Sequence, residues 1–192
     1  MKKFFTLRNI VLCCGALFLL VAFFLSFAAR LSFSIGEHSA VVKNIVWGAN
    51  KLITDGTEVP FEDGFGIEKA GPAVLPFVGI ILMILAAIGA ILVALFVKAP
   101  WAKWVVVGLA VVAIAGAVFQ FFAFDQTIRA IINQTAKEAG VTDKEQIKKA
   151  IEEAKEMYGE LNPKATVNVI MGVLGIVGGL TVCASQFLPE KK

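Results

Sequence analysis

Four long apolar runs, separated by hydrophilic segments, set the pattern of the 192-residue chain. Each run has about the 20 residues that a helix needs to cross the roughly 30 Å hydrocarbon core of a bilayer. The sequence therefore predicts a mostly α membrane protein, a four-helix transmembrane bundle in a single domain, 1–192. The expected membrane helices span about 10–29, 73–97, 104–124 and 167–188.

The first hydrophilic segment, 30–72, alternates apolar and polar residues in short pieces, as half-buried strands do. Asp55-Gly56 lies between two short β-prone runs, which is a strong signal for a two-residue hairpin turn. We expect an antiparallel β-meander of three or four strands over about 31–59. The run 40–47 is β-branched and fits a strand, but its apolar residues also share a helical face.

The third apolar run continues as an amphipathic helix beyond the length that a membrane needs. A helical apolar stripe follows over 125–135, and 143–158 carries a second stripe. Gly140 is expected to end the first helix, and Thr142 with Glu145 matches a capping box that opens the second. The sequence thus predicts an extended helix three that forms a helical hairpin over about 125–158.

Composition supports an integral membrane protein. The chain is 58% hydrophobic and only 17% charged, whereas soluble domains contain about 45–50% apolar and about 25% charged residues. The mean hydropathy is +0.79, so the lipid bilayer is the first expected partner. The net charge is only +3, without a basic patch interleaved with aromatic residues, and no nucleic-acid partner is expected.

The distribution of charge predicts the orientation. The short leader, the turn at 98–103 and the tail hold seven of the 18 basic residues in about 20 positions. The long loops, 30–72 and 125–166, hold the other 11 in about 85 positions, together with 14 acidic residues. The positive-inside rule then predicts a multi-pass plasma-membrane protein with both termini cytoplasmic and both long loops extracytoplasmic.

Few residues are candidates for chemistry. The apolar cores of the four expected helices contain no ionisable residue, which argues against a pump or a membrane enzyme. No catalytic residue, metal site or cofactor is predicted. Gln120 is the candidate intramembrane polar contact: it either bonds a neighbouring helix or lines a site between the helices.

Small residues predict where helices pack closely. They either pack within the bundle or bind another membrane protein or another copy. They are Ala86, Ala90 and Ala94 in the second helix and Gly172, Gly175 and Gly179 in the fourth. Trp47, in the middle of the first loop, either anchors the small sheet or is a partner-contact residue, since exposed tryptophans often dominate such contacts.

The arrangement resembles the claudin and peripheral-myelin-protein group in topology. That group has four helices, a small sheet in the first outer loop, a tight inner turn and an extended third helix. Its first-loop signature is a Trp followed by Gly-Leu-Trp and two cysteines. Here Trp47 is followed by Gly48-Ala49, and neither cysteine is present.

These features predict a non-enzymatic membrane protein that acts as a scaffold, adhesion or accessory subunit through an extracytoplasmic cap. The expected partner is another membrane or extracytoplasmic protein, or a second copy of the chain. The alternative is a small transporter or channel component with a site between the helices near Gln120.

Overall fold

A computed structural model describes residues 6–35 and 38–188. Over these residues the structure is 68% helical, with four long apolar helices and one small antiparallel four-stranded sheet, as the sequence predicted. In the described part of the chain, four helices are long and apolar enough to cross a membrane, which is consistent with a multi-pass membrane protein. They are Leu7–Ala28, Val74–Phe96, Ala102–Glu138 and Thr166–Ser185.

The chain forms two compact units, each built from separate segments. The helical unit comprises Met1–Leu25, Val78–Gln120 and Ile170–Lys192. The mixed unit comprises Ser26–Phe77 and Phe121–Val169. The chain passes between the units four times. The single-domain organisation stays a prediction.

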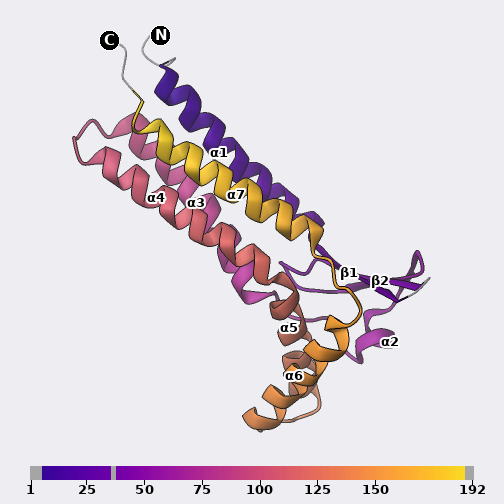
Figure 1. The fold of residues 1–192 in the computed structure, drawn as a ribbon. Coiled ribbons are helices and arrows are strands. Elements are labelled where there is room, and N and C mark those ends of the chain that lie inside the picture. Colours follow the sequence, from indigo (N-terminus) through magenta and orange to yellow (C-terminus); the bar gives the residue numbers. More distant parts are fainter. Residues whose placement is uncertain (1–5, 36–37, 189–192) are drawn as a thin grey trace. The chain divides into compact units, whose positions relative to one another are not determined.

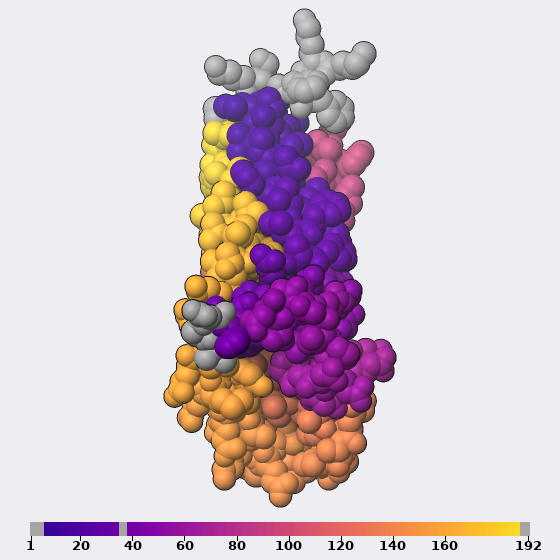
Figure 2. Space-filling model, turned by 90° about the vertical axis from the view of Figure 1, so that its right-hand side faces the viewer, coloured from indigo at the N-terminus to yellow at the C-terminus, as the bar shows by residue number. Residues whose placement is uncertain are grey.

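Four helices lie side by side in the helical unit (Figure 1). They belong to α1 (Leu7–Leu25), α3 (Val74–Phe96), α4 (Ala102–Val118) and α7 (Thr166–Ser185). Figure 2 shows α1 running alongside α7 on one face. The first helix begins earlier than the expected residue 10, because the Thr6 hydroxyl accepts a hydrogen bond from the Asn9 N–H (3.3 Å) and caps its start.

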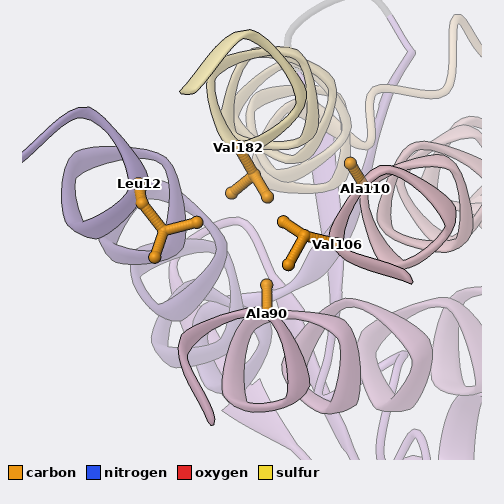
Figure 3. Close-up of a cluster of buried hydrophobic side chains, with 5 residues drawn as sticks. All are labelled: Leu12, Ala90, Val106, Ala110 and Val182. Carbon is orange, nitrogen blue, oxygen red and sulfur yellow. The ribbon is translucent and has the colours of Figure 1, made fainter. Parts of the chain in front are cut away.

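A cluster of small and branched side chains fills one level of this unit (Figure 3). Each helix contributes, and every member is at most 1% exposed. The cluster consists of Leu12 from α1, Ala90 from α3, Val106 and Ala110 from α4, and Val182 from α7. Small residues on α3 and α4 let the helix axes approach closely, which increases dispersion contacts where lipid offers no hydrophobic drive.

Glycines bring helix backbones into direct contact at two crossings. A Cβ on Gly79 of α3 would collide with the carbonyl oxygen of Gly116 on α4, and one on Gly116 would lie 2.6 Å from that of Gly79. Between α1 and α7, a Cβ on Gly15 would lie 2.8 Å from the Gly178 carbonyl oxygen. Neither crossing has room for a side chain.

The sheet of the mixed unit is a meander with strand order β1-β2-β3-β4. Its strands are β1 (Arg30–Ile35), β2 (His38–Lys43), β3 (Lys51–Thr54) and β4 (Thr57–Val59).

Two turns fix the register of these strands. Asp55 and Gly56 both have positive φ, at 50° and 81°, as a type I′ hairpin requires, so the predicted hairpin is confirmed. The open question over 40–47 is resolved as a strand that stops at Lys43. Asn44 takes a φ of 60°, and its carbonyl accepts hydrogen bonds from the N–H groups of Trp47 and Gly48.

The outer edge of β1 is covered by the segment that precedes α7. Ser32 and Lys164 exchange two backbone hydrogen bonds, of 3.0 and 2.8 Å, and Ser34 N–H donates to the Leu161 carbonyl (3.1 Å). The short helix α2 (Phe61–Phe65) follows β4.

The extended third helix is continuous in the chain from Ala102 to Glu138, 37 residues. A 3₁₀ turn, η2 (Phe119–Phe122), joins α4 to α5 (Ala123–Glu138). Gly140 ends α5 as predicted, with a φ of 70°. The N–H groups of Gly140 and Val141 donate to the carbonyls of Lys137 (3.2 Å) and Ala136 (2.8 Å), the two bonds of a Schellman motif.

The second arm of the hairpin is α6 (Lys144–Gly159). The expected capping residue was wrong by one position: Asp143, and not Thr142, caps α6, and its carboxylate accepts the Glu145 N–H (2.9 Å). A carboxylate suits this place because it also faces the positive end of the helix dipole.

The two arms bury the apolar faces that the sequence predicted. Ile128 and Ile131 of α5 and Ile151 and Ala154 of α6 are all buried. Asp125 accepts hydrogen bonds from Arg129 on its own helix (Nε to Oδ2, 2.7 Å) and forms an ion pair with Lys155 of α6. Burial alone would raise the pKa of Asp125, but the bonds from Lys155 and Arg129 outweigh it and lower this pKa.

We predict that Gly79→Ala destabilises the helical unit by about 1–3 kcal/mol, because a methyl group must push two backbones apart. Gly108→Ala is the matched control, since nothing lies within 4 Å of a Cβ there, and it is expected to be neutral or stabilising. Thermal unfolding in mild detergent measures both. Equal stability of the two variants would show that the helices do not meet at Gly79.

We predict that Asp125 stabilises the hairpin of α5 and α6 in a pH-dependent way. Its native pKa lies below the usual value, so its contribution is complete above about pH 4 and is lost as the pH falls through the native pKa. At neutral pH, Asp125→Asn should cost about 1 kcal/mol, since solvent screens a partly exposed pair. Hydrogen exchange of the α6 amides checks this.

The control for this prediction is Glu153→Gln, which removes an exposed carboxylate 3.7 Å from Lys149 and should change exchange little. If hydrogen exchange of the α6 amides changes identically in Asp125→Asn and in the native chain between about pH 5 and pH 3, the ion pair does not stabilise the hairpin.

Candidate functional site

A pocket of about 260 Å³ opens to solvent on the mixed unit. One wall is the β1–β3 face of the sheet, and the others come from α2 and from the end of α6. Its lining residues are Phe33, His38, Ser39, Ala40, Leu52, Thr54, Gly64, Phe65, Tyr158 and Leu161.

Strand register accounts for the hollow. Phe33 of β1 pairs with Ala40 of β2, and Ala40 pairs with Thr54 of β3, so the three side chains form one row on one face. Leu52 lies two residues before Thr54 and shares that face. Because Ala40 is small and stands between larger neighbours, the row has a gap at its centre.

Aromatic side chains enclose the gap. The rings of Phe33 and Tyr158 lie 5.5 Å apart between centroids, and Phe65 packs against Phe61 at 4.7 Å. Tyr158 is half-buried, and burial raises the pKa of its hydroxyl. A Cβ on Gly64 would collide with the Leu52 side chain, so α2 rests directly on the sheet beside the pocket.

The polar rim of the pocket includes His38 and Ser39, and both bond to Asp55, which lies beside the lining. Asp55 Oδ1 accepts the Ser39 backbone N–H (2.8 Å), and its Oδ2 lies 2.9 Å from His38 Nδ1. Asp55 N–H donates in turn to the Ser39 carbonyl (2.8 Å). The hydrogen bond from Ser39, followed by that from His38, lowers the pKa of Asp55. A carboxylate that is charged at neutral pH therefore lies next to the rim residues His38 and Ser39.

This arrangement is suited to binding. It combines an apolar, aromatic body with a few polar groups at its mouth, the usual composition of a ligand pocket. Among residues 6–35 and 38–188, no three His, Cys, Asp or Glu side chains are grouped so as to hold a metal ion.

Trp47, the predicted partner-contact residue, lies outside this pocket and is packed within the mixed unit. Its indole N–H donates to the Ser26 hydroxyl (2.9 Å). Its ring stacks on Phe27 at 5.1 Å and meets Phe77 edge-on at 5.4 Å. These contacts favour the anchoring role, and a partner contact at Trp47 stays a prediction.

Gln120, the predicted intramembrane polar residue, is fully buried in the helical unit. A Cβ on Gly79 would lie 2.8 Å from its Nε2, so the amide lies beside the crossing of α3 and α4.

The predicted packing residues of α3 and α7 are also within the helical unit. Ala86 and Ala90 are buried, and Ala94 is partly buried against the cluster in Figure 3. On α7, a Cβ on Gly175 would lie 2.6 Å from that of Ala117, and one on Gly179 would lie 3.1 Å from the Ala110 carbonyl. Gly172 is buried as well. These contacts favour packing within one chain.

Sequence reasoning missed the pocket. The only available signal was that Tyr158, the single tyrosine, lies at the end of the apolar face of the second hairpin helix. Its contact with Phe33 joins two segments more than 100 residues apart, which periodicity does not reveal.

Comparisons with protein-family models, with curated proteins and with solved structures find no match to this chain. The resemblance to the claudin group therefore concerns topology alone and carries no argument about ligands or partners.

We predict that the Tyr158 hydroxyl ionises above its ordinary pKa of about 10, because burial disfavours the phenolate. Phe33→Ala should bring the midpoint back toward about 10 by admitting water to the ring. Ultraviolet absorbance of the phenolate measures this without ambiguity, since the chain has one tyrosine. If the native chain has a midpoint at or below that of free tyrosine, water reaches the Tyr158 ring and the pocket wall is open at this residue.

Proposed function

We propose that this chain is a non-enzymatic multi-pass membrane protein that acts as a scaffold, adhesion or accessory subunit. The observation that carries the proposal is the aromatic pocket of the mixed unit, which offers apolar surface to a partner. Pockets that receive one anchoring side chain are typical centres of protein–protein contact.

The orientation is part of the proposal. The helical unit holds seven basic residues and one acidic residue, and the mixed unit holds 11 basic and 14 acidic residues. This asymmetry supports cytoplasmic termini and an extracytoplasmic mixed unit in a plasma membrane.

A transporter or channel site near Gln120 has less support. A pore at that level needs a water-filled space beside the amide. Gly79 and Gly116 instead lie in close contact next to Gln120, with no room for one methyl group.

The test is affinity purification of the full-length protein from its own membranes in mild detergent, with mass spectrometry of the co-purified proteins. We expect a stoichiometric partner with the native chain, and at least about a tenfold loss of it with Ala40→Phe, which fills the pocket. Lys148→Gln, at an exposed position on α6, is the control and should keep the partner.

A native chain that purifies alone would contradict the proposal. So would a partner retained equally by native chain and Ala40→Phe, because the contact would then lie away from the pocket.

A further inference from the structure

The size of the pocket limits what it can hold. Pockets for drug-sized ligands have roughly 300–1,000 Å³, and this one has about 260 Å³. One large side chain fills such a volume. Three of the lining residues, Phe33, Phe65 and Tyr158, are aromatic, and aromatic rings pack well against one another in offset or edge-to-face arrangements.

Asp55, which bonds to the rim residues His38 and Ser39, favours hydrogen-bond donors on a bound partner. The Asp55 side chain is 47% exposed, and its two oxygens retain lone pairs after accepting from Ser39 and His38. When His38 Nδ1 carries the proton shared with Asp55, its Nε2 is an acceptor. A cationic ammonium or guanidinium group is the donor that binds a carboxylate most strongly.

Acidic residues also flank the lining in the sequence. Asp63 precedes Gly64 and Glu160 precedes Leu161, and both are exposed. Lys51, which precedes Leu52, is paired with Glu58 at 3.0 Å. The mixed unit as a whole has 11 basic and 14 acidic residues, a formal charge of −3, and this field attracts positively charged segments.

We propose that the pocket receives one aromatic side chain of the partner protein, presented by a basic segment in which Lys or Arg flanks the ring. The ring packs among Phe33, Phe65 and Tyr158, and a flanking cation pairs with Asp55. This inference rests on the proposed function and specifies the chemistry of its partner.

The chain provides its own reporters for a test. Tyr158 and His38 are its only tyrosine and its only histidine, and both line the pocket. Incorporated 3-fluorotyrosine gives one ¹⁹F resonance from inside the pocket. Histidine labelled with ¹³C in the ring gives one resonance from the rim.

The experiment titrates the full-length protein, in nanodiscs of zwitterionic phosphatidylcholine, with three blocked peptides at neutral pH. They are Gly-Lys-Trp-Lys-Gly, Gly-Glu-Trp-Glu-Gly and Gly-Lys-Ala-Lys-Gly. We expect saturable shifts of both resonances with the first peptide, and binding weaker by about tenfold or more with the other two. Added salt should weaken binding of the first peptide, because salt screens solvent-exposed charge pairs.

Variants separate the ring contact from the charge contact. Asp55→Asn should reduce the preference for the Lys-Trp-Lys peptide over the Glu-Trp-Glu peptide by about tenfold, with the ring contact kept. Ala40→Phe should abolish binding of all three peptides. If Ala40→Phe does not fold, Thr54→Trp, at an exposed position on the same strand row, blocks the mouth instead.

Three results would overturn the inference: equal binding of the acidic peptide, equal binding of the alanine peptide, or shifts with tryptamine and none with any peptide. The last result would assign the pocket to a free aromatic amine. If the native chain captures a partner that Ala40→Phe loses, but the basic peptide is not preferred over the acidic one, the proposed function stands and this inference falls. If the basic peptide binds and no partner is captured, the proposed function falls.

Discussion

Direct contact between glycine backbones is the constraint on which the helical unit depends. Lipid is as apolar as the helices, so helices associate through close packing and not through exclusion of water. Gly79 and Gly116 let α3 and α4 touch, and Gly15 and Gly178 do the same for α1 and α7. These contacts leave Gln120 as a buried amide in a packed core, whereas the mixed unit carries an open pocket.

In the mixed unit, the pocket arises because the small Ala40 stands between larger side chains in one row across the strands. Aromatic side chains enclose it, and the Asp55 carboxylate lies beside it. The Asp55 turn does two things with one residue. Its positive φ closes the β3–β4 hairpin, and its carboxylate ties the start of β2 to that turn through Ser39 and His38. The same bonds that tie the strands at this turn thus hold the Asp55 carboxylate next to the pocket.

Local signals were enough to predict much of this fold. Apolar runs gave the four long helices, Asp55-Gly56 gave a hairpin, and Gly140 gave the end of α5, because each depends on neighbours in sequence. The cap of α6 was predicted at Thr142 and lies at Asp143; both residue types are good caps, so the pattern alone could not separate them. The pocket could not be predicted, since Phe33 meets Tyr158 only after the sheet and the hairpin have folded.

The covered edge of β1 has a consequence for synthesis. Ser32 pairs with Lys164, which follows it by 132 residues. At translation rates of about 5–20 residues per second, that edge waits on the order of ten seconds for its partner strand. During this interval the nascent sheet presents unpaired backbone groups, which other chains can pair with. Biogenesis of this protein therefore favours a compartment or a chaperone that shields strand edges until Lys164 has been made.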